Sequence, residues 1–117
     1  MRVYRAALGT RVPDCFPIVR ECYVGANHKT AVEECRAALQ YKYDAYASWG
    51  LSSRNQPTFE ELARNRFIIG DATFVKEEIA RYREALGVDH FMMRCHWPGL
   101  EFEKALGSIK RLGKIFA

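Results

Sequence analysis

Short strand-like runs alternate with amphipathic helical segments along this chain, and this order limits the folds open to it. Residues 16–24 (FPIVRECYV) and 88–94 (VDHFMMR) are rich in β-branched and aromatic side chains, which favours extended strands. A helical segment follows each of these runs. Strands that alternate with helices pair in parallel through right-handed crossover connections. The sequence therefore predicts an α/β fold with a parallel sheet.

The helical segments carry start and stop signals. A capping box in TAVE and apolar residues at three- and four-residue steps predict a helix over about 27–50. A second box predicts a short helix that begins after Thr58. The segment 71–87 starts with an aspartate and stops at a glycine, which is typical of a capped helix. The last helix is predicted over 102–116, with basic side chains near its negative end.

Three other segments are shorter or irregular. Residues 1–14 fit the end of a helix followed by a loop, and residues 51–57 (LSSRNQP) are predicted as a polar loop. Residues 66–70 (RFIIG) form either a buried strand or only an apolar connection, because so short a run fits both.

Length and composition indicate one globular domain over residues 1–117, because 49% of the residues are hydrophobic and 27% are charged. The apolar runs are too short to cross a bilayer, and the N-terminus lacks the apolar core of a secretory signal. We therefore expect a cytoplasmic protein with no membrane partner.

The net charge of +4 raises the question of an anionic partner. The charges are interleaved along the helical segments, which is typical of solvated helix faces and disfavours a nucleic-acid partner. A cationic pocket for a phosphate-bearing cofactor would need only a few of these side chains.

No common catalytic motif is present. The sequence contains no G-x-S-x-G elbow, no H-E-x-x-H and no Walker loop. The four cysteines form no C-x-x-C pair, so buried reduced thiols are favoured over disulfides or zinc. His90, Cys95 and His96 also lack zinc-ligand spacing, and we predict no metal site.

The predicted sheet raises a packing problem. Two or three parallel strands with helices on one side leave the other sheet face bare and the outer strand edges unpaired. A second copy of the chain is the simplest cover, so we expect a homo-oligomer, most simply a dimer.

Two stretches resemble the C-terminal end of the luciferase-like flavin-dependent monooxygenases. Residues 68–116 (IIGDATFVKEEIARYREALGVDHFMMRCHWPGLEFEKALGSIKRLGKIF) share a Gly-Asp helix start, Gly-Val-Asp before the last strand, and Pro-Gly before a closing helix. Residues 17–35 (PIVRECYVGANHKTAVEEC) are similar to the preceding strand and helix of that family. Ala72 stands where the family usually has proline, which is compatible with the same helix start.

The resemblance implies a partial (β/α)8 (TIM) barrel made of its last two or three βα units. Residues 17–24 would be the seventh strand and residues 89–94 the eighth, with residues 66–70 in the insertion between them. The first six strands and a Gly-rich phosphate loop are missing. The implied cofactor is FMN or a related flavin, whose binding by this chain alone would be incomplete.

Chemistry in such barrels lies at the C-terminal ends of the strands. The resemblance therefore implies that Asn27 and His28 contact a cofactor after the first strand. After the last strand, Arg94 could pair with a flavin phosphate or an anionic substrate, and Trp97 could wall the isoalloxazine ring. His96 is the catalytic candidate, as a donor to a reduced-oxygen intermediate or a carbonyl.

These residues also have structural interpretations. Arg94 could instead pair with Glu101 or Glu103, and Trp97 is more often a packing anchor. His28 is most simply a helix-start residue.

Two functional hypotheses follow. The first is an oxidoreductase segment of the luciferase-like type, which uses reduced flavin and O2 on a small organic substrate and is inactive as an isolated monomer. The alternative is a non-catalytic module that self-associates or binds a ligand.

Overall fold

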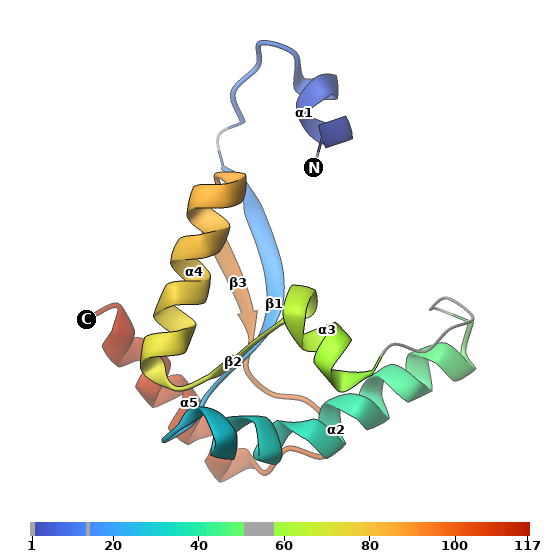
Figure 1. Cartoon of the computed structure of the whole chain (residues 1–117), viewed down its shortest axis with the longest axis vertical. Coiled ribbons are helices and arrows are strands. Elements are labelled where there is room, and N and C mark those ends of the chain that lie inside the picture. The colour runs from blue at the N-terminus through green and yellow to red at the C-terminus, as the bar shows by residue number, and fades with distance from the viewer. Residues whose placement is uncertain (1, 14, 51–57) are drawn as a thin grey trace.

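Three strands form one parallel sheet in the computed structural model of this chain, which describes residues 2–13, 15–50 and 58–117 (Figure 1). The strands are β1 (Pro17–Val24), β2 (Phe67–Gly70) and β3 (His90–Arg94), in the spatial order β2-β1-β3. Both pairings are parallel, so the predicted α/β fold with a parallel sheet is confirmed. The short apolar run at 67–70 is a paired strand, which settles the alternative that the sequence left open.

Five helices accompany the strands in the described part of the chain: α1 (Arg2–Leu8), α2 (His28–Ser48), α3 (Phe59–Arg66), α4 (Ala72–Leu86) and α5 (Phe102–Ile115). Their ends follow the capping residues. Asn27 and Asp71 accept a backbone N–H with their side chains, and Thr58 forms a full capping box at the start of α3. Gly87 ends α4 in the left-handed conformation, at φ 71°. The predicted loop over residues 51–57 lies outside the described residues.

Side chains alternate along the strands between two faces, each with its own apolar core. On the α2 face, Tyr23, Phe67 and Ile69 pack with α2 and α3. On the α4 face, Cys22 and Ile68 pack with α4. Figure 1 shows α4 and α3 on opposite sides of the strands. Both faces of the sheet therefore carry helices.

The predicted partial barrel is wrong, because the sheet is open and wound in two directions. In a barrel each strand pairs with the next one and all helices lie outside. Here the chain moves from β1 to β2 on one side, and then returns past β1 to β3 on the other side. Right-handed crossovers in opposite directions place α2 and α4 on opposite faces. The sequence resemblance did not reveal this, because it assigned residues 66–70 to an insertion rather than to the sheet.

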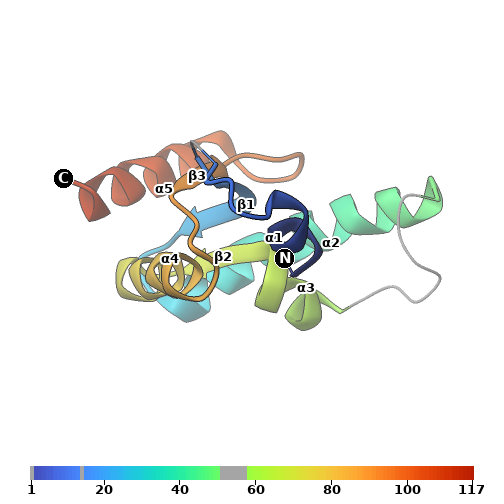
Figure 2. The same cartoon turned by 90° about the horizontal axis from the view of Figure 1, so that it is seen from above.

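Helix α5 covers the end of β1 that β3 leaves free. Arg94, the last residue of β3, lies opposite Glu21, whereas β1 continues to Val24. The Val24 backbone N–H donates to Ser108 Oγ at 2.8 Å, and Arg111 donates to the Val24 carbonyl at 3.3 Å. Figure 2 shows α5 beside β3, away from α3. The carboxyl end of β1 is thus closed on this side by a helix.

The homo-oligomer was expected because one sheet face would be bare, but helices pack on both faces of this sheet. What remains uncovered is the N-terminal half of the α2 face, where Val19 and Met92 lie opposite each other and are 37% and 45% exposed. Self-association remains a prediction. Across residues 2–13, 15–50 and 58–117, none of the helices has both the length and the apolarity that a membrane crossing requires.

Candidate functional site

A cavity of about 300 Å³ opens between α2, α3 and the end of β2. Its wall is mostly apolar and contains the rings of Phe59, Phe67, Phe74 and His28. Such a lining, with a few polar groups at its edge, is typical of small-molecule sites. Among the sequence-predicted site residues, His28 is the one that lines this cavity.

Glycine at position 70 allows the histidine to reach the cavity. A Cβ on Gly70 would lie 2.5 Å from the Phe74 ring and 2.8 Å from His28 Nδ1, which is too close for either contact. Without that Cβ, the His28 and Phe74 rings meet edge to face with centroids 4.6 Å apart. The residue type at the end of β2 therefore sets the shape of the cavity.

An ion pair stands at the rim of the cavity. Arg36 of α2 lies 2.5 Å from the Glu60 carboxylate of α3, and both side chains are about half exposed. The Arg36 guanidinium also lies 4.8 Å from the centre of the Phe59 ring, in a cation–π contact. The hydrogen bond from Arg36 lowers the pKa of Glu60. The ion pair thus links α2 to α3 at the rim, while the residues deeper in the cavity are apolar.

A second polar cluster lies on the α2 face, centred on the buried Glu21. Lys42 Nζ of α2 lies 2.5 Å from the Glu21 carboxylate, and Arg94 Nη1 lies 3.4 Å from it. Burial, followed by the Glu21 charge, raises the pKa of Tyr43. Arg94 does not pair with Glu101 or Glu103, as one interpretation of the sequence proposed, because the strand register sets it beside Glu21.

The loop after β3 turns its aromatic residue into the core. Trp97 is 3% exposed and belongs to the core of the α2 face. Its indole N–H is buried, with no hydrogen-bond partner among the described residues. His96 Nε2 lies 3.1 Å from the Leu100 carbonyl oxygen, and the His96 ring packs edge to face against Phe102. This part of the chain is built as a packed turn.

The predicted site residues therefore do not converge. Asn27 caps α2 by accepting the Thr30 N–H at 2.9 Å, and His28 lines the cavity. The cavity is not lined by Arg94, His96 or Trp97. The cause is the unequal length of the strands, since β3 stops opposite Glu21 while β1 runs on to its end at Val24.

Among the described residues, those that the sequence predicted to contact a flavin do not surround one cavity. The cavity is at the lower limit of volumes that hold drug-sized ligands. The orphaned indole N–H of Trp97 is enclosed in the core, and Trp97 is not among the residues that line the cavity. Arg94 could still offer donors to an anion, because its side chain is 56% exposed.

The cysteines differ in exposure, since Cys15 is exposed whereas Cys22 and Cys35 are buried. Cys22, Cys35 and Cys95 are free, and burial raises the pKa of Cys22 to about 12 and that of Cys95 above its ordinary value. These thiols stay protonated near neutral pH and are poor nucleophiles. Within residues 2–13, 15–50 and 58–117, no group of three or more His, Cys, Asp or Glu side chains is placed to hold a metal ion.

Sequence reasoning missed the residues that shape the cavity. Phe59, Phe67 and Phe74 come from three different elements, and the sequence brings none of them near His28. A signal existed for the buried ion pair, since Glu21 is the one charged residue on its face of the strand and needs a cation when it is buried. The partner Lys42 could not be identified, because helix-to-strand register is a tertiary property.

Comparisons with known proteins identify a similar fold but no family. No family model matches the sequence, and no curated protein matches it. Among solved structures, the fold is similar to monooxygenase RslO1 from Streptomyces bottropensis, with a TM-score of 0.73 and 16% sequence identity. The match covers 97% of this chain and 34% of that one, so this chain spans about a third of that protein's length. At this identity the likeness concerns the fold alone.

Proposed function

We propose that this chain is part of an oxidoreductase of the monooxygenase class, similar to the luciferase-like flavin-dependent enzymes. In such an enzyme a reduced flavin and O2 act on a small organic substrate. The observation that carries the proposal is the fold similarity to a monooxygenase over 97% of the chain. The sequence resemblance over residues 68–116 supports it.

The cavity beside His28 is the part of the site that this chain supplies. Its aromatic walls suit an apolar organic molecule, and its volume of about 300 Å³ suits a small one. His28 would orient a polar group of the substrate from the wall, while the Arg36–Glu60 pair borders the entrance. These contacts bind and position a substrate and do not carry out oxidation by themselves.

The remaining groups require another polypeptide or a second copy to complete the site. Arg94 is half exposed and is the proposed contact for an anionic group, and His96 is the proposed proton donor. Trp97 would support their loop by packing, with Asn27 holding the start of α2. The chain alone is therefore expected to be inactive as a monooxygenase.

Titration of the purified chain with FMN, followed by quenching of the flavin fluorescence, tests the proposal. We expect weak quenching that Arg94→Gln reduces and Arg81→Gln leaves unchanged, because Arg81 is held by Glu78 within α4. No quenching at high micromolar FMN, with or without a candidate partner chain, would rule out flavin-dependent activity for this polypeptide.

A second candidate is a non-catalytic ligand-binding module with the same fold. It is favoured by the structural use of the predicted residues, since Asn27 caps a helix, Trp97 packs in the core and Arg94 pairs with Glu21. This module would bind a small aromatic molecule in the cavity without flavin. His28→Ala should weaken binding of a probe such as indole, whereas His90→Ala on the exposed start of β3 should not.

We also propose that the chain self-associates through the exposed part of the α2 face. Val19 and Met92 lie side by side there, and β3 is an edge strand that can pair with the same strand of a second copy. Light scattering should show a dimer whose population falls in Met92→Lys. Tyr41→Lys, which changes an exposed aromatic residue on α2, is the control. A monomer at all concentrations would refute the dimer.

A further inference from the structure

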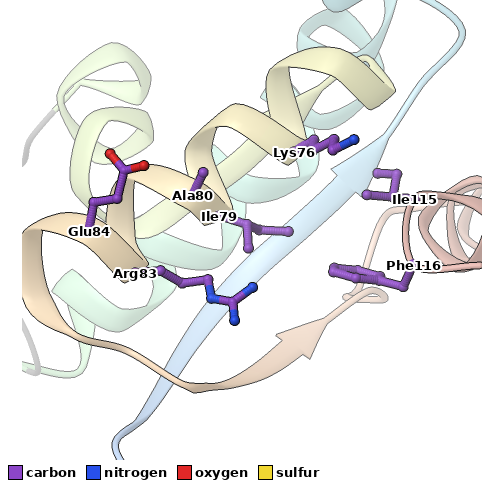
Figure 3. A pocket seen from close by; sticks show the side chains of 7 residues that line it. All are labelled: Lys76, Ile79, Ala80, Arg83, Glu84, Ile115 and Phe116. Carbon is purple, nitrogen blue, oxygen red and sulfur yellow. The ribbon is translucent and has the colours of Figure 1, made fainter.

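A groove runs between α4 and the C-terminal end of α5, on the opposite sheet face from the cavity beside His28. It encloses about 410 Å³, and Ile79, Ile115 and Phe116 form its apolar part. Figure 3 shows Ile79 of α4 pointing towards Ile115 and Phe116, while Glu84 points away from them. Phe116 is 62% exposed, so a large aromatic surface faces solvent here.

One end of the groove is strongly basic. An adjoining cavity of about 310 Å³ is lined by Lys76, Arg111 and Lys114, and Lys76 and Ile115 line both cavities. No carboxylate lines this adjoining cavity in the described part of the chain. Its three cations make no ion pair with any described residue. Like charges brought together in this way repel each other unless an anion lies between them.

Other cations, such as Arg83 and Lys110, also lack an ion pair among the described residues, but at the groove three unpaired cations line one cavity. Lys42, Arg36 and Arg81 each lie within 2.8 Å of a carboxylate oxygen. At the groove, by contrast, Arg111 donates one hydrogen bond to the Val24 carbonyl and has further donors. A guanidinium and two ammonium groups around one cavity suit the oxygens of a phosphate ester.

We propose that the groove binds an organic phosphate with a flat apolar body. The phosphate lies among Lys76, Arg111 and Lys114, and the apolar body packs on Ile79, Ile115 and Phe116. Charge complementarity selects this ligand over an apolar helix or an uncharged molecule. The site is independent of the proposed oxidoreductase function, because neither Arg94 nor His28 lines either cavity.

Isothermal titration calorimetry of the full chain with three probes tests the two parts of the groove. 1-Naphthyl phosphate carries both the flat body and the phosphate, 1-naphthylmethanol lacks the charge, and inorganic phosphate lacks the body. We expect 1-naphthyl phosphate to bind at least about tenfold more tightly than either of the others, because two kinds of contact combine. Equal binding of inorganic phosphate, equal binding of the alcohol, or no binding of 1-naphthyl phosphate would overturn the proposal.

Matched variants then locate the site. Lys76→Gln with Lys114→Gln should weaken 1-naphthyl phosphate binding by roughly tenfold. Lys29→Gln with Lys104→Gln removes the same charge at positions that line neither cavity and should leave binding within about twofold. Arg111 is left intact because it also supports β1.

The apolar part has its own pair of variants. Phe116→Ala should weaken binding by about fivefold, whereas Phe102→Ala, at a phenylalanine of similar exposure outside the groove, should not. Equal losses in test and control variants would place the ligand elsewhere and refute the site. Because FMN also carries a phosphate and a flat ring, flavin quenching supports the oxidoreductase proposal only if Arg94→Gln reduces it and Lys76→Gln with Lys114→Gln does not. In that way either proposal can fail alone.

Discussion

The two faces of the sheet are covered in different ways. The α2 face combines aromatic packing with a buried ion pair between Glu21 and Lys42, and it leaves a cavity beside His28. The α4 face is packed mainly by aliphatic, aromatic and thiol groups, its strand cation Arg20 lies over the Tyr82 ring, and the groove cations stay at the surface. The stability of the α2 face therefore depends on specific polar partners, whereas that of the α4 face depends mainly on filling the space between strands and helices with apolar side chains.

This difference follows from the strands. Glu21 points towards α2, so the covering helix must bring a cation into the interface, and Lys42 does so. On the other face, Cys22 and Ile68 require only apolar neighbours, which Val75 and Ile79 supply. A buried charge is costly without its partner, whereas apolar contacts tolerate small changes. The two faces should then respond differently to mutation.

The largest effect is expected for Glu21→Leu, which leaves Lys42 without its carboxylate in a nearly buried position. We expect a loss of about 3 kcal/mol in the free energy of unfolding, measured by urea denaturation. The double variant Glu21→Leu with Lys42→Leu should recover most of this loss, because no buried charge remains. A loss in Glu21→Leu below about 1 kcal/mol would show that the α2 face does not depend on the pair.

The second prediction concerns how closely α2 approaches the end of β1. A Cβ on Gly25 would lie 2.7 Å from Ala31 Cβ and 3.0 Å from Ala31 Cα, so Gly25→Ala must push the helix away. We expect a loss of about 2 kcal/mol by thermal or urea unfolding.

The matched control is Gly113→Ala in α5, where an added Cβ meets nothing within 4 Å. This variant should gain up to about 0.5 kcal/mol, because alanine stabilises a helix relative to glycine. If Gly25→Ala is as well tolerated as Gly113→Ala, close packing of α2 is not needed to hold this face.

Sequence patterns predicted most of the local elements, although the box expected in TAVE is wrong because Asn27 is the N-cap of α2. Capping residues such as Thr58 and Asp71 act within one turn, so their signal is contained in a few adjacent letters. Strand-like composition also identified the extended segments. The order of the strands was not accessible in this way, because the four residues of β2 give no periodicity that distinguishes a paired strand from a connection.

The candidate site shows the same limit. The carboxyl-end rule placed His28 and Arg94 at a common rim, which holds only when neighbouring strands end at the same level. The register of β3 against β1 separates them, and no sequence pattern in either strand encodes that register. The cavity was missed because its walls come from α2, α3, β2 and α4 together.

A third test uses two adjacent isoleucines that point to opposite faces. Ile68 is fully buried on the α4 face, whereas Ile69 lines the cavity on the α2 face. Ile68→Val should cost about 1 kcal/mol and Ile69→Val about 0.5 kcal/mol, because the second loses a methyl group that borders open space. Urea unfolding of both variants measures the difference. A larger loss of unfolding free energy in Ile69→Val than in Ile68→Val would contradict the view that the α4 face depends more strongly on close apolar packing.

The smallest effect on stability is expected when the exposed ion pairs on the two sides of the sheet are removed. On the α2 side, Arg36 joins α2 to Glu60 of α3, whereas on the α4 side Arg81 pairs with Glu78 within one helix. The pKa of Glu60 is lowered in the folded protein by Arg36, so the pair stabilises the fold above the ordinary carboxyl pKa. That contribution disappears as the pH falls through the lowered pKa.

A pH titration of the Glu60 carboxyl carbon by NMR tests the direction of this shift. In Arg36→Gln the pKa of Glu60 should rise towards its ordinary value, and the thermal stability of the variant should converge with that of the parent at acid pH. Arg81→Gln should leave the Glu60 titration unchanged, since its partner lies within α4. An unchanged Glu60 pKa in Arg36→Gln would mean that α2 and α3 are held by the apolar walls of the cavity alone, and that their surface charges add nothing to the α2 face.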